Sequence, residues 1–93
     1  MAFATTNPYT GETVKTFEEA TPAEIDAAVG REHAAFLRWR ETSFEQRAQV
    51  LRRAAELLRA KPREFAQILT LEMGKLIGEA EAEVELCAKI LDY

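Results

Sequence analysis

The chain is poor in the residues that build disulfides, metal sites and membrane spans. Its 93 residues include one cysteine, Cys87, and one histidine, His33. One cysteine excludes an internal disulfide and a metal site made only of thiolates, and one histidine excludes a site of several imidazoles. No apolar run reaches the roughly 18–20 residues that a transmembrane helix needs. The first residues lack a basic region and an apolar stretch of signal-peptide length, so the expected location is the cytoplasm.

Glycine-rich phosphate loops are also missing. The four glycines never fall into a G-x-G-x-x-G or Walker pattern, so we predict no cofactor-binding residue in this chain. The formal net charge of −4 gives no support to nucleic-acid binding. Hydrophobic residues make up 47% of the chain, which is typical of a folded protein and too apolar for a disordered one.

Charge is unevenly distributed along the chain. Residues 43–63 carry a net charge of +4, and residues 76–93 carry −4. Attraction between the two segments is expected to contribute little if the charges are exposed. Aromatic residues do not interleave with the arginines, which is against a surface for phosphate or nucleic acid.

Local patterns predict a mainly α-helical protein with an N-terminal β-hairpin. The hairpin is expected over residues 3–17, because Asn7, Pro8 and Gly11 favour a turn between two β-prone segments. Four helices are expected at about residues 22–40, 44–61, 62–73 and 76–93. Thr21 and Ser43 are predicted to begin the first two as N-caps, and Gly74 to end the third.

Each predicted helix carries apolar residues at three- and four-residue spacing, which favours one buried face. The expected inward residues are, in chain order, Ile25, Ala28, Val29, Phe36 and Trp39; Phe44, Ala48, Leu51, Ala55 and Leu58; Phe65, Ile68, Leu69 and Met73; Ile77, Ala80, Val84, Cys87, Ala88 and Leu91.

The last predicted helix carries a second apolar stripe on roughly the opposite side, formed by Leu86, Ile90 and Tyr93. A helix at the surface of a complete small domain usually has one apolar face. We therefore expect the sequence to stop within a helix of a larger protein. The alternative is a complete, free-standing helical module that uses this stripe for self-association or for binding a partner helix.

Residues with reactive side chains are expected to be structural. Cys87 lies on the apolar stripe between Val84 and Leu91, and burial makes a thiol inert. His33 is interpreted as a solvated or capping residue. The alternating glutamates at positions 79 to 85 spread around the helix, so we interpret them as solvated as well. No catalytic residue is predicted in this chain.

Several segments together resemble the N-terminal part of the aldehyde dehydrogenase superfamily. Residues 7–12 read NPYTGE, residues 51–58 read LRRAAELL, and residues 71–75 read LEMGK; these segments occur in the family's order. The sequence of residues 11–17 and 42–44 is most similar to that of the bacterial succinate-semialdehyde dehydrogenases that use NADP. Leu76 departs from the family pattern, which often has proline after the GK pair.

This resemblance implies that the chain is the beginning of a dimeric or tetrameric enzyme with an α/β, Rossmann-like aldehyde dehydrogenase fold. In that family a cysteine thiolate attacks the aldehyde, hydride passes to NAD or NADP, and a glutamate activates the water that releases the acid. None of those groups lies in the family's first hundred residues. The chain by itself is therefore expected to be inactive and to bind no cofactor.

The resemblance also implies a structural monovalent cation in some members. The matching positions here are Thr5 and Glu72, whose oxygen atoms suit a hard cation. The expected partners are the remainder of the dehydrogenase chain and further copies of it, with no nucleic acid and no membrane.

Overall fold

The N-terminal residues form the expected antiparallel hairpin. The computed structural model describes residues 2–93, and its first elements are strands β1 (Phe3–Thr6) and β2 (Thr13–Phe17). Phe3 pairs with Phe17, and the register shifts between Thr5 and Thr6. In the turn, the Asn7 side-chain oxygen accepts a hydrogen bond from the Tyr9 backbone N–H at 2.9 Å, and Gly11 has a φ of 76°. These are the turn functions predicted for both residues.

Four helices follow: α1 (Pro22–Trp39), α2 (Phe44–Ala60), α3 (Pro62–Met73) and α4 (Ile77–Asp92). Their bounds differ from the expected ranges by at most one residue. Thr21 and Ser43 each begin a helix with a capping box, in which the cap side chain and the side chain three residues later exchange hydrogen bonds with each other's backbone N–H. The chain is therefore mainly α-helical, as its capping signals predicted.

The core lies where α4 packs against α2 and α3. Four alanines there are 0% exposed, and Val84 is 5% exposed. Larger apolar side chains surround this contact and remain half-buried; they are Leu58, Phe65, Leu69 and Ile77. Because alanine is small, the helix backbones approach closely. The fully buried alanines are Ala55, Ala66, Ala80 and Ala88.

Several residues expected in the core are exposed instead. Phe44 is 87% exposed and Met73 is 74% exposed, and Ile68 and Leu51 are also exposed. The predictions for these residues were wrong for the described chain because α2, α3 and α4 cover one side of one another only. Ala66, which was not predicted to face inward, is fully buried.

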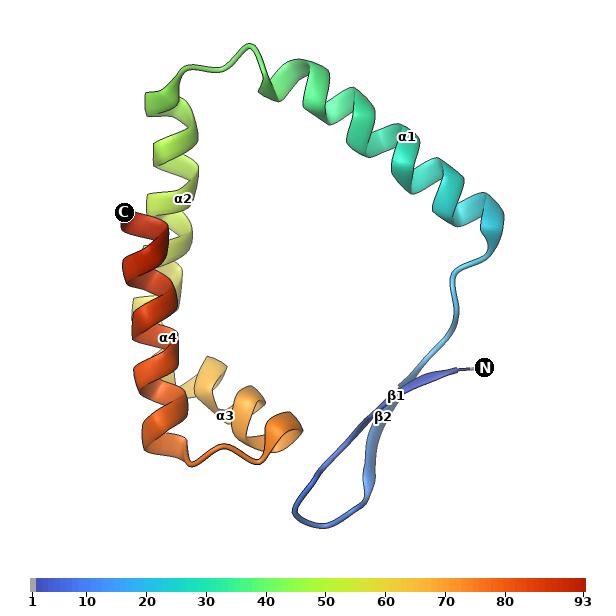
Figure 1. Cartoon of the computed structure of the whole chain (residues 1–93), viewed down its shortest axis with the longest axis vertical. Coiled ribbons are helices and arrows are strands. Elements are labelled where there is room, and N and C mark those ends of the chain that lie inside the picture. The colour runs from blue at the N-terminus through green and yellow to red at the C-terminus, as the bar shows by residue number, and fades with distance from the viewer. Residues whose placement is uncertain (1) are drawn as a thin grey trace.

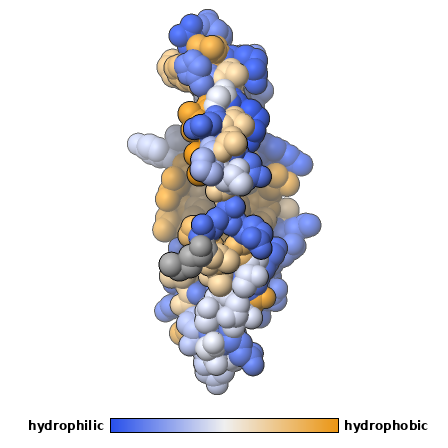
Figure 2. All heavy atoms as spheres, turned by 90° about the vertical axis from the view of Figure 1, so that its right-hand side faces the viewer, coloured by the Kyte–Doolittle hydropathy of each residue, from blue (hydrophilic) through white to orange (hydrophobic). Residues whose placement is uncertain are grey.

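The molecule is open (Figure 1). The hairpin and α1 form one arm, and α2 with α4 forms the other. The radius of gyration is 17.4 Å, against about 12 Å for a compact domain of this length. Figure 2 looks from the side of α1 and the hairpin and shows hydrophobic atoms gathered between more hydrophilic ends. The apolar face of α1, formed by Ile25, Val29, Phe36 and Trp39, is exposed.

The turn of the hairpin meets the joint between α3 and α4. Gly74 ends α3 in the left-handed conformation, with a φ of 70°, and its N–H donates to the Thr70 carbonyl at 3.0 Å. A Cβ placed on Gly74 would lie 3.1 Å from Pro8 Cγ. The strands themselves remain largely exposed. The hairpin thus approaches the end of α3 at its turn.

Among residues 2–93, no helix combines the length and the apolar character needed to cross a membrane.

We predict that Ala80→Leu destabilises the protein by about 1–3 kcal/mol, because the added methylenes overpack a site with 0% exposure. The matched control is Ala82→Leu, on the exposed side of the same helix, which should change the free energy of unfolding by less than about 0.5 kcal/mol. Urea denaturation followed by circular dichroism measures both variants. Equal effects of the two substitutions would contradict the alanine-packed core.

A second prediction concerns Gly74. Gly74→Ala should destabilise by about 1–2 kcal/mol, because a side chain strains the left-handed conformation and approaches Pro8. Gly78→Ala is the control: Gly78 lies in α4 with open space around it, so alanine should stabilise that helix by about 0.5–1 kcal/mol. Thermal unfolding should thus show shifts of opposite sign, and shifts of the same sign would refute the assignment.

Candidate functional site

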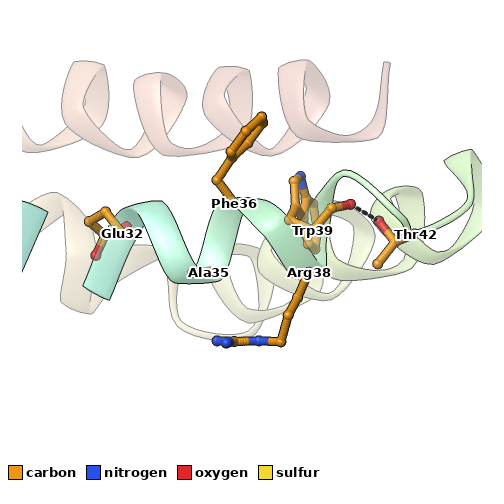
Figure 3. Close-up of a pocket in the computed structure, with 6 residues that line it drawn as sticks. All are labelled: Glu32, Ala35, Phe36, Arg38, Trp39 and Thr42. Carbon is orange, nitrogen blue, oxygen red and sulfur yellow. Dashed lines mark hydrogen bonds between the residues drawn. The ribbon is translucent and has the colours of Figure 1, made fainter. Parts of the chain in front are cut away.

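A hollow lies along the C-terminal half of α1 (Figure 3). This groove, called the α1 groove below, has a volume of about 480 Å³ and is lined by Glu32, Ala35, Phe36, Arg38, Trp39 and Thr42. Phe36 and Trp39 are three residues apart and project from the same side of the helix, whereas Arg38 projects from the other side. The groove is mainly apolar and has charged residues at its rim.

The end of the α1 groove is ordered by local hydrogen bonds. The Thr42 hydroxyl donates to the Trp39 carbonyl at 2.6 Å. The guanidinium of Arg47, from the first turns of α2, donates through Nε to Thr42 Oγ1 at 3.0 Å. No site role was predicted for Arg47 from the sequence. Its contacts with the corner between α1 and α2 could not be predicted from the sequence, because they depend on the direction that the chain takes between these two helices.

A second hollow of about 370 Å³ lies at the joint between α3 and α4. Its lining comprises Leu69, Met73, Gly74, Lys75, Leu76, Glu79 and Glu83. Lys75 forms an ion pair with Glu83. This hydrogen bond, with the attraction of both glutamates, raises the pKa of Lys75 above its ordinary value despite partial desolvation. A lysine held in its charged form in this way is a poor nucleophile.

Ion pairs also connect the basic and acidic segments. Arg59 of α2 binds Asp92, and its Nε lies 3.4 Å from Glu85 Oε1, both on α4. Hydrogen bonding to Asp92 raises the pKa of Arg59. Arg63 of α3 binds Glu81 at 2.9 Å. All these side chains are substantially exposed, so each pair contributes little to the free energy of unfolding.

The hydrogen bonds at the N-cap of α1 shift the pKa of a glutamate. The Glu24 carboxylate accepts a hydrogen bond from the Thr21 backbone N–H at 2.7 Å. This bond and one from the Thr21 side chain lower the pKa of Glu24 below its ordinary value. Glu24 thus acts as a capping residue of α1, which carries the groove.

The burial predicted for Cys87 was wrong in the described chain, since its side chain is exposed. Ala80, Val84 and Ala88 form the contact face of α4, at four-residue steps, and Cys87 lies beside that face. His33 lies against the Phe36 ring, with 6.2 Å between the ring centroids. Neither residue lies in a cluster of acid, base and nucleophile.

Thr5 and Glu72, the two residues expected near a cation, lie on segments that meet. Thr5 is half-buried in β1, three residues before Pro8, and Glu72 is exposed in the last turn of α3, two residues before Gly74. The contact of Pro8 with Gly74 brings the two segments together. Within residues 2–93, no group of three or more histidine, cysteine, aspartate or glutamate residues is placed to hold a metal ion. A cation at Thr5 and Glu72 would therefore need further oxygen ligands.

Comparisons with known proteins address the whole chain. Residues 1–93 match the model of a family described as the aldehyde dehydrogenase family. The chain is 52% identical over 91 residues to the succinate-semialdehyde dehydrogenase (NADP+) of Deinococcus radiodurans, covering 98% of this chain and 19% of that protein. It is 50% identical over 93 residues to succinate-semialdehyde dehydrogenase (NADP+) 1 of Mycobacterium tuberculosis, covering all of this chain and 20% of that protein.

A solved structure supports the same relationship. It is a succinic semialdehyde dehydrogenase from Streptococcus pyogenes in complex with NADP+. The TM-score is 0.91 at 39% identity, and the match covers 99% of this chain and 20% of that one. The chain thus spans about one fifth of the length of the relatives that it matches.

Proposed function

The chain belongs to the aldehyde dehydrogenase family, and from this we propose that residues 1–93 are the N-terminal part of an NADP-dependent succinate-semialdehyde dehydrogenase. The observation that carries the proposal is the identity of 50–52% over nearly the whole chain to relatives of that name. The reaction oxidises the aldehyde to the carboxylic acid and reduces NADP. We propose that the complete enzyme is a cytoplasmic homo-oligomer.

The role of these residues in that enzyme is structural. We propose no catalytic group among these residues, because the resemblance implies that the groups of the family's reaction belong to later parts of such an enzyme. What these residues offer is apolar surface: the face of α1 and the second stripe of α4, with Leu86, Ile90 and Tyr93, are exposed. Surfaces of this extent pack against other parts of a protein. Residues 1–93 alone should therefore be inactive.

The same exposed stripe on α4 is the observation that favours the second candidate, a free-standing module for self-association or for binding a partner helix. The two candidates differ in the polypeptide that the gene encodes and in its activity. A dehydrogenase needs a longer polypeptide that reduces NADP, whereas a module needs neither.

The test is an assay of the complete polypeptide that contains these residues. With succinic semialdehyde, absorbance of NADPH should rise, and kcat/KM should be at least about tenfold higher with NADP than with NAD, a difference of about 1.4 kcal/mol. Propionaldehyde, which lacks the carboxylate, should be the poorer substrate. Residues 1–93 expressed alone serve as the negative control. A complete polypeptide that reduces neither cofactor with any aldehyde would overturn the proposal.

We also propose that Thr5 and Glu72 contribute oxygen ligands to a structural monovalent cation in the complete enzyme. Support comes from the contact between their two segments at Pro8 and Gly74, and from the preference of hard cations for oxygen. The remaining ligands would come from backbone carbonyls, water or residues outside this chain. The cation would hold the hairpin against the end of α3.

The cation proposal predicts a salt-specific effect on stability. A cation at about five times its Kd stabilises the folded enzyme by about 1 kcal/mol, so Tm should be higher in KCl or NaCl than in choline chloride of equal ionic strength. Glu72→Gln should abolish this difference, whereas Glu64→Gln, an exposed carboxylate on the same helix, should preserve it. A difference that survives Glu72→Gln would exclude Glu72 as a ligand.

A further inference from the structure

The arm formed by the hairpin and α1 meets the other helices at its two ends (Figure 1). The extensive helix interfaces of the structure are those of α4 with α2 and with α3, and α1 forms none comparable among residues 2–93. At one end of the arm the turn of the hairpin lies against the end of α3, where Pro8 meets Gly74. At the other end the chain passes from α1 into α2 through a corner at residues 40–43. The position of the arm therefore depends on these two joints.

Arg47 holds the corner between α1 and α2 through four hydrogen bonds. Besides Thr42 Oγ1, its guanidinium donates through Nη2 to the backbone carbonyls of Trp39 at 3.2 Å, Arg40 at 3.1 Å and Thr42 at 3.2 Å. The last carbonyls of a helix have no partner within the helix, and a positive charge there also interacts favourably with the helix dipole. One side chain of α2 thus satisfies the end of α1.

The same guanidinium contacts an aromatic ring on each side of the corner. Its central carbon lies 5.9 Å from the centroid of the Trp39 ring, at the end of α1, and 5.7 Å from that of Phe44, at the start of α2. At these distances the interaction of the cation with each ring is favourable. The planar, forked shape of arginine allows these contacts to be made together, so Arg47 sets the direction in which α1 leaves α2.

The length of α1 makes the hairpin sensitive to the angle at this corner. A helix of 18 residues is about 27 Å long, so a rotation of about 10° at its C-terminal end moves its N-terminal end by about 5 Å. That displacement exceeds the roughly 4 Å between atoms in contact, so it is sufficient to separate Pro8 from Gly74. The backbone before α1 is also restricted, because Thr21 and Glu24 form a capping box and Pro22 has a fixed φ.

We propose that the arm is a lever that couples the two joints, so that opening of either one promotes opening of the other. When the Arg47 corner loosens, the effective concentration of the hairpin turn at Gly74 falls. When the turn leaves Gly74, α1 is free to rotate at the corner. Such a coupling is reciprocal, so each joint changes the opening equilibrium of the other by the same factor. It depends on the contacts within residues 2–93 and does not require the proposed function.

Hydrogen–deuterium exchange of the complete polypeptide, read by mass spectrometry, tests the coupling from the corner. Arg47→Met should raise the exchange rate of backbone amides by about tenfold both in the last turn of α1 and in the hairpin, through local opening. The control is Arg53→Met, an exposed residue on the same helix that pairs with Glu56, and it should change neither region. A rise confined to the corner would overturn the proposal, because the chain between β2 and α1 would then absorb the rotation. An equal rise throughout α2–α4 would overturn it as well.

Gly74→Ala tests the coupling from the other joint. It should raise amide exchange in the hairpin and, by a similar factor, in the last turn of α1, whereas the control Gly78→Ala, with open space around it, should raise neither. Unchanged exchange at the end of α1 would show that the joints open independently.

A milder change at the corner gives a further test. Arg47→Lys keeps the charge and loses the fork, so exchange should rise less than in Arg47→Met and in the same proportion at both joints. A rise at the corner with none in the hairpin would again refute the lever. Exchange is measured without turnover, so loss of dehydrogenase activity would count against the proposed function alone.

Discussion

The packing of α4 onto α2 and α3 is the interaction on which the rest of the structure depends. It contains every residue that is buried among those described, and four of the five are alanines. Small side chains let the helix backbones approach closely. The contact therefore depends more on the close fit of the helix backbones than on the apolar area that large side chains would bury. Ion pairs from Arg59 and Arg63 to α4 lie at the exposed edge of this contact. Everything else is attached to this unit through two joints.

The two joints work by different physics. At Gly74 the backbone takes a left-handed conformation that residues with a Cβ resist, and the Pro8 ring lies 3.1 Å from the position that a Cβ would take. At the other corner, Arg47 satisfies carbonyls at the end of α1 and contacts two aromatic rings. One joint brings the hairpin turn to α3, and the other sets α1 relative to α2. Together they hold the two arms apart (Figure 1).

The open shape and the exposed apolar faces support the proposal that these residues belong to a longer enzyme. The chain spans about one fifth of the length of the relatives that it matches. We propose that other parts of such an enzyme pack against these faces, and that this region contributes a supporting framework of helices.

Local sequence determined the elements of this protein. The caps at Thr21 and Ser43, the turn residues Asn7 and Gly11, and the stop at Gly74 act through bonds and dihedral angles within a few residues, so they could be predicted without knowing the fold. The amino-acid sequences of the hairpin and of the LEMGK segment were sufficient to predict the family. Burial was predicted less well: an apolar stripe indicates which face of a helix needs cover, but not whether the cover lies within these residues.

Tertiary structure alone decided which of those faces are covered. Met73, Phe44 and Cys87 satisfied the same spacing rules as Val84, yet they are exposed, because α4 offers a single contact face to α2 and α3. Tertiary structure likewise decided two contacts: that of Arg47 with the end of α1, and that of Pro8 with Gly74. Each joins groups whose proximity depends on the direction the chain takes after a turn, and that direction is not encoded in the periodicity of any one segment.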